Sequence, residues 1–68
     1  MKLQMLNTTY EVENSEEAEH LIKDYCDEYG FNYKRGLMPG CYIIVEINVD
    51  DEGIPFEYII DVVAIIDE

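Results

Sequence analysis

Basic residues are scarce in this chain: its 68 residues include four Lys and Arg but sixteen Asp and Glu, which gives a formal net charge of -12. A surface this acidic repels nucleic acid and anionic lipid, and it attracts basic protein surfaces or cations. The composition therefore disfavours direct binding to nucleic acid or to a membrane. It leaves two interpretations of the acidity, a solubilising coat or a working surface.

Residues that usually carry catalysis or metal binding are also few. His20 is the only histidine, and Cys26 and Cys41 lack both Cys-x-x-Cys spacing and a basic neighbour that would lower a thiol pKa. The glycines are too scattered for a phosphate-binding loop. Residues 48–53 carry oxygen ligands as a calcium loop does, but Ile59 stands where the closing Glu of such a loop belongs. We therefore expect no catalytic residue, no metal site and no cofactor.

Long apolar runs are missing as well. No stretch approaches the roughly 18 apolar residues of a membrane span, and the apolar run at the N-terminus is too short for a signal peptide. We therefore expect a cytoplasmic protein with reduced thiols that serve as packing residues; the alternative is one disulfide between Cys26 and Cys41, which nothing in the sequence requires. The length allows one domain, 1–68, and an apolar content of 49% is too high for disorder.

The clearest element that is present is a helix between Asn14 and Gly30. Asn14 or Ser15 can cap its N-terminus, Glu17 completes a capping box with Asn14, and Gly30 suits the left-handed position after the last turn. Apolar residues within this segment have the spacing of one buried stripe. They are Ala18, Leu21, Ile22, Tyr25 and Tyr29.

Alternating apolar and polar residues predict strands on both sides of the helix. Residues 2–13 are predicted to form a hairpin that turns at Asn7-Thr8, and residues 41–49 and 54–66 to form two long strands joined by a turn at 50–53. Residues 31–35 could add one short strand. The predicted fold is α+β in the order ββαββ, with a single helix packed on an antiparallel sheet of four strands, or five with the short one.

Both faces of the long hairpin are apolar, so its orientation has to be inferred. We expect the odd-numbered positions of 41–49 and the even-numbered positions of 56–66 to face the helix. The opposite face carries apolar residues interrupted by acidic and amide side chains. Because one helix cannot cover both sides of a sheet, this second face is predicted to meet a partner, a second copy or in part water. Its candidate residues are Tyr42, Ile44, Ile59, Val63 and Ile65.

Acidic residues form a row on the predicted helix. Glu17, Asp24 and Glu28 fall within about 40° of one another on a helical wheel and extend for about 16 Å. Such a row can stand in for phosphates and bind a Lys- and Arg-rich channel, although an ordinary solvated helix face has the same pattern. The candidate acidic residues for partner binding are Glu16, Glu17, Glu19, Asp24, Asp27, Glu28, Asp50, Asp51 and Glu52.

The acidic helix from Glu16 to Glu28, together with Asp50-Asp51-Glu52 and Asp67-Glu68, resembles in kind the small acidic proteins of phages and mobile elements that block host defence, including DNA-mimic anti-CRISPR proteins. The resemblance spans the chain and includes no diagnostic motif. It implies a non-enzymatic inhibitor that occupies a basic nucleic-acid-binding surface of a host-defence effector, such as a CRISPR-Cas complex. The alternative is a small regulatory or structural homodimer that binds through the apolar face of its C-terminal hairpin.

Overall fold

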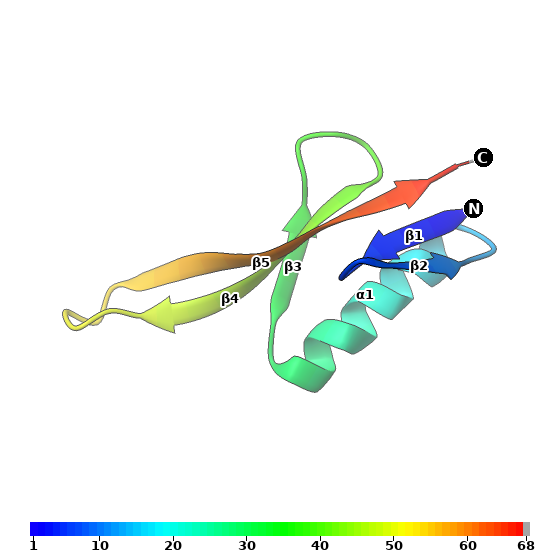
Figure 1. Cartoon of the computed structure of the whole chain (residues 1–68). Coiled ribbons are helices and arrows are strands. Elements are labelled where there is room, and N and C mark those ends of the chain that lie inside the picture. Colours follow the sequence, from blue (N-terminus) through cyan, green and yellow to red (C-terminus); the bar gives the residue numbers. More distant parts are fainter. Residues whose placement is uncertain (68) are drawn as a thin grey trace.

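The computed structural model describes residues 1–67 and shows one helix packed against one face of a five-stranded antiparallel sheet (Figure 1). Its elements are β1 (Lys2–Met5), β2 (Thr8–Glu11), α1 (Ser15–Tyr29), β3 (Asn32–Arg35), β4 (Cys41–Val49) and β5 (Pro55–Ile66). The strands lie side by side in the order β2-β1-β5-β4-β3. The predicted α+β class is confirmed. The element order is ββαβββ, not ββαββ, because β3 pairs with residues 42–45 as an edge strand.

Helix α1 begins and ends where its capping residues predict. The Asn14 side chain accepts a hydrogen bond from the Glu17 backbone N–H at 2.8 Å, and the Glu17 carboxylate accepts one from the Glu13 N–H at 3.2 Å. Gly30 has a φ of 74°, a conformation that glycine adopts without a steric penalty. Of the predicted stripe, Tyr29 is exposed, whereas Cys26 is buried on the same side as Ile22.

The N-terminal hairpin turns one residue earlier than predicted. Leu6 and Asn7 both have positive φ values, 54° and 62°, as the central residues of a two-residue hairpin turn require. The left-handed conformation is unfavourable for Leu. A hydrogen bond from the Leu6 N–H to the Asp61 carboxylate, at 2.7 Å, holds this turn against β5.

The core lies between α1 and the face of the sheet that we call the covered face. Three strands supply most of its sheet side: β1, β4 and β5. The helix supplies one residue per turn from its inner side, and Val12 closes the end near the helix N-terminus. The buried cluster consists of Leu3, Met5, Val12, Ala18, Ile22, Cys26, Tyr42, Ile44 and Val63.

The predicted orientation of the long hairpin is wrong. Tyr42, Ile44 and Val63 were expected on the face away from the helix, but they are buried against it, and Ile65 packs at the edge of the same cluster. Ile59 alone of that set is strongly exposed on the other face. The apolar pattern could not decide which face of β4 packs against the helix, because apolar residues occupy all its odd-numbered positions and, at Tyr42 and Ile44, two of its even-numbered ones.

A β-bulge explains why the side chains of Ile59 and Val63 lie on opposite faces of the sheet. Ile44 pairs with Asp61, but the next residue, Val45, pairs with Ile59, so the register passes over Ile60. Paired residues direct their side chains to the same face, and an extra residue therefore reverses the alternation beyond it. As a result Val63 lies on the covered face and Ile59 on the opposite one, which we call the open face.

The β4–β5 hairpin extends well beyond the helix, which makes the molecule elongated, with extents of 46 × 24 × 19 Å (Figure 1). A helix of 15 residues is about 22 Å long, whereas a strand of 12 residues reaches about 40 Å. Within the hairpin, β3 pairs only with residues 42–45, and β1 pairs only with residues 64–66. The part of the hairpin between Glu46 and Ile59 therefore has no neighbouring strand on either edge among residues 1–67, and we call it the overhang.

Candidate protein-binding surfaces

The outer side of α1 is a strongly acidic surface. Glu16, Glu17, Asp24, Asp27 and Glu28 are all exposed, as predicted, whereas Glu19 is half-buried on the flank that faces Tyr33 of β3. His20 Nε2 lies 3.5 Å from the Asp24 carboxylate. Within residues 1–67, no Lys or Arg side chain forms an ion pair with these six carboxylates. Their charge is therefore open to an external cationic surface.

Two of the predicted binding residues also accept hydrogen bonds from backbone N–H groups. The Glu17 carboxylate accepts the Glu13 N–H just before α1, while the Glu17 N–H donates to the Asn14 cap, so the predicted capping box with Asn14 forms only in its first half. Asp50 accepts hydrogen bonds from the N–H groups of Glu52 and Ile54, both at 2.9 Å, and so shapes the turn between β4 and β5. Mutating either carboxylate would therefore disturb local structure as well as charge, and neither is suitable for a clean test of binding.

The acidic residues fall into two separate groups. The helix carries one, and the turn at Asp50-Asp51-Glu52 carries the other at the far tip of the overhang (Figure 1). The sequence could not show this separation, because it depends on how far the hairpin projects past the helix. A single flat basic surface would have to span most of the molecule's length to contact both groups.

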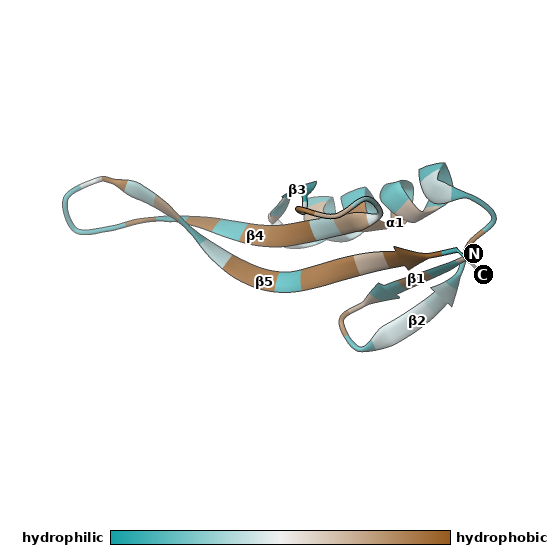
Figure 2. Ribbon diagram, turned by 90° about the horizontal axis from the view of Figure 1, so that it is seen from above, coloured by the Kyte–Doolittle hydropathy of each residue, from teal (hydrophilic) through white to brown (hydrophobic). Residues whose placement is uncertain are grey.

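The open face is the second candidate surface, and it is apolar. Figure 2 shows hydrophobic residues along most of β4 and β5. Four of the open-face side chains are more than half exposed: Ile47 by 52%, Val49 by 63%, Ile59 by 66% and Val62 by 61%. Val45, between them, is 2% exposed although it lies outside the core cluster. Except for Ile59, these residues were predicted to face the helix, so sequence reasoning placed the apolar surface on the wrong side of the sheet.

Charges on the open face cancel. The register places Lys2 opposite Glu11, and it places Lys34 and Glu57 beside the apolar residues of β4. Lys34 Nζ lies 2.9 Å from a Glu57 carboxylate oxygen. Among residues 1–67, two cations and two carboxylates leave this face without net charge, so most of the formal charge of -12 belongs to other parts of the chain. No simple signal in the sequence shows this charge balance, because the balance depends on which residues share a face of the sheet.

The opposite side of the overhang exposes aromatic rings. Phe56 and Tyr58 contact each other edge to face, with centroids 5.2 Å apart, and neither is covered by α1. A second aromatic group lies at the end of the helix, where Tyr29 stacks on Phe31 at 6.1 Å and Tyr25 lies beside both. The overhang thus exposes apolar side chains on both sides, together with Glu46 and Asn48 on the side of the rings, which is unfavourable for a two-stranded ribbon in water.

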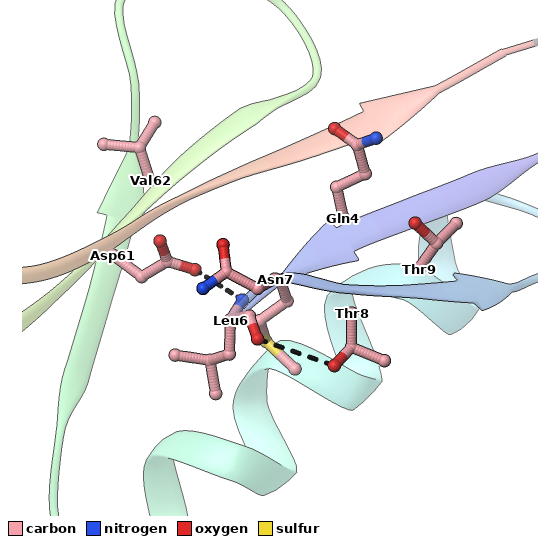
Figure 3. A pocket seen from close by; sticks show the side chains of 8 residues that line it. Gln4, Leu6, Asn7, Thr8, Thr9, Asp61 and Val62 are labelled. Carbon is pink, nitrogen blue, oxygen red and sulfur yellow. Dashed lines mark hydrogen bonds between the residues drawn. The ribbon is translucent and has the colours of Figure 1, made fainter.

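A shallow pocket beside the N-terminal hairpin is polar but offers no catalytic chemistry (Figure 3). The turn of β1–β2 forms one wall, and Asp61 and Val62 form the other. Asp61 already accepts the Leu6 N–H, and the Thr8 hydroxyl donates to the Leu6 carbonyl at 3.5 Å. No histidine or thiol lines the pocket, so its carboxylate has a structural role.

The remaining reactive groups are isolated or protected. Cys26 is buried, and burial, with a smaller effect from the Asp27 carboxylate, raises the pKa of its thiol. Cys41 is half-buried and free. In the part of the chain that the structure describes, no three His, Cys, Asp or Glu side chains lie close enough together to hold a metal ion. Over the same residues, no helix has the length and apolar character needed to cross a bilayer.

No protein-family model, no curated protein and no solved structure matches this chain. Its function therefore has to be argued from its own surfaces, of which two stand out: the acidic side of α1 and the neutral, apolar open face.

Proposed function

We propose that this protein is a non-enzymatic acidic binding protein that occupies a basic, nucleic-acid-binding surface of another protein. One observation carries the proposal: the outer side of α1 exposes five carboxylates without a Lys or Arg partner among residues 1–67. A rigid helix holds three of them, Glu17, Asp24 and Glu28, in a fixed row, as a nucleic-acid strand holds its phosphates. An effector of host defence, such as a CRISPR-Cas complex, is the class of partner that the acidic resemblance implies.

The binding energy in this proposal is collective. Each exposed ion pair contributes about 0–1 kcal/mol, so no single carboxylate dominates. Several pairs together also release counterions from the partner's groove, which makes the affinity fall steeply as the salt concentration rises. Competition with nucleic acid follows directly, because both ligands require the same Lys and Arg residues.

The test is displacement of labelled duplex DNA from purified CRISPR effector complexes by this protein. We compare the natural chain with a variant that carries Asp24→Asn, Asp27→Asn and Glu28→Gln, whose carboxylates accept no backbone hydrogen bond from residues 1–67, unlike that of Glu17. The matched control carries Glu11→Gln, Glu13→Gln and Asp67→Asn, which remove the same amount of charge from exposed positions outside the helix and outside the predicted binding residues. We expect the helix variant to bind about 10- to 100-fold more weakly, with a flatter salt dependence. The control variant should lose much less binding affinity.

Two results would contradict this proposal. If the natural chain does not displace DNA from any of the effectors at low salt, the partner class is wrong. If the helix variant and the control displace DNA equally well, total charge and not the helix surface determines binding, and α1 is an ordinary solvated helix.

A further inference from the structure

The open face has the size of a weak protein–protein interface. β4 is about 30 Å long, and the sheet is about 20 Å wide where β3 and β1 flank the hairpin, but it narrows to two strands in the overhang. The flat area is therefore about 400 Å², so two copies would bury about 800 Å² in total, which is typical of weak or transient interfaces. Its most exposed apolar residues are β-branched: Ile47, Val49 and Ile59 in the overhang and Val62 nearer the middle of the sheet are each more than half exposed. These side chains pack well when two sheets stack.

The charge distribution limits what can cover this face. A basic partner is drawn to the acidic surfaces of α1 and of the hairpin tip and gains no electrostatic energy at a neutral face. A second copy of this chain meets strong repulsion wherever two acidic surfaces approach each other. The open face is the one large surface of the described sheet where two copies can approach without placing uncompensated carboxylates together, because Lys2, Lys34, Glu11 and Glu57 cancel there.

We propose that two copies of this chain pack open face against open face and form a two-sheet sandwich. Sheets stacked in this way lie about 10 Å apart with their strands roughly aligned, and a second copy brings a sheet of identical length and twist. The exposed β-branched residues of both copies interdigitate, and the overhang gains the support that it lacks in a single chain. Helix α1 lies on the other side of the sheet in each copy, so both acidic helices remain outside and free to bind.

The primary experiment measures molecular mass by sedimentation equilibrium between about 1 and 300 µM chain, a range suited to the weak association that is typical of small interfaces. We expect a reversible monomer–dimer equilibrium whose dissociation constant decreases as NaCl rises from 20 to 500 mM. Salt screens the long-range repulsion between two chains of charge -12 while leaving apolar contact intact. This direction is opposite to that expected for acidic binding to a basic partner, so the two proposals fail separately.

Two variants test which face of the sheet forms the dimer interface. Val62→Glu places a carboxylate on the open face of each copy, so the dimer would bury two unpaired charges. We expect the affinity of the dimer to fall about 100-fold or more. Tyr58→Glu is the matched control: it lies on the same strand, its side chain is 57% exposed against 61% for Val62, and it faces the opposite side. The control should retain the dimer within about threefold. Circular dichroism checks that both variants are folded.

A measurement on the natural chain needs no variant. The methyl groups of Ile47 and Val62 should become protected from a soluble paramagnetic probe as the chain concentration rises, whereas the Phe56 ring should not. Three results would overturn the proposal: a monomer at 300 µM in high salt, equal weakening by the two variants, or a dimer in which these methyl groups stay accessible. A monomeric chain would leave the open face to a different protein.

Discussion

Replacing Ile44 and Ile47 by Ala in turn tests the assignment of the two faces most directly. The residues are identical in type and lie on the same strand, but Ile44 is 0% exposed and Ile47 is 52% exposed. Ile44→Ala removes atoms from the core beside Ile22 and Val63 and leaves a cavity, which costs about 2–5 kcal/mol. Ile47→Ala creates no cavity in a single chain, and it should cost less than about 1 kcal/mol, mainly through lower β-propensity.

The expected loss is large relative to the whole stability of the domain. At 0.05–0.15 kcal/mol per residue, a chain of 68 residues has a free energy of unfolding of about 3–10 kcal/mol. Urea unfolding followed by circular dichroism resolves the difference, since a slope of about 1 kcal/mol per molar urea separates the two midpoints by at least about 1 M. The chain concentration should be about 1 µM, so that self-association adds little apparent stability.

Ile44→Ala could leave too little folded protein to measure, so Ile44→Val and Ile47→Val form a milder pair. The first should cost about 0.5–1.5 kcal/mol because it removes one buried methyl group, and the second should cost almost nothing. Equal losses in both pairs of variants, or a larger loss at Ile47, would refute the assignment of Ile44 to the covered face.

Two further predictions concern the helix. Asn14→Ala should lower the free energy of unfolding by about 1 kcal/mol, because the Glu17 N–H loses its capping acceptor, and an unchanged urea midpoint would show that this cap is dispensable. Burial raises the pKa of the Cys26 thiol in the folded chain, so its contribution to stability is present below the ordinary thiol pKa of 9.0 and is lost as the pH rises through the higher folded-state value. Iodoacetamide should accordingly modify Cys41 faster than Cys26 at pH 8, and equal rates would contradict the burial of Cys26.

Local signals predicted the helix well because its end groups and its buried stripe are encoded within a few residues. Asn14 and Gly30 mark its ends in the sequence and in the structure. The two long strands and the turn between them were also predictable from β-branched runs and from the polar residues at 50–53. The extra strand β3 was left open because four residues carry too weak a pattern to separate an edge strand from a loop.

The candidate surfaces were harder to predict because they depend on three-dimensional register. Glu46 and Asn48 suggested that their face of β4 points away from the core. This holds only in the overhang, because nearer the helix Tyr42 and Ile44 of the same face are buried. Comparing the length of the helix with that of the strands would have indicated that α1 cannot cover the whole hairpin. The bulge that moves Ile59 to the open face has no recognisable sequence signal in this chain.

The overhang has a consequence for how this chain can vary in length. It contributes nothing to the buried cluster around Ile22, so residues can be added or removed there without reshaping the core. Removing one residue from each strand of the overhang would exchange its faces and move the acidic and amide side chains of Glu46 and Asn48 to the apolar side. Removing two from each strand would restore the alternation. Natural variants of this hairpin should therefore differ by even numbers of residues per strand, and the distance between the acidic tip and the helix would change in steps of about 7 Å.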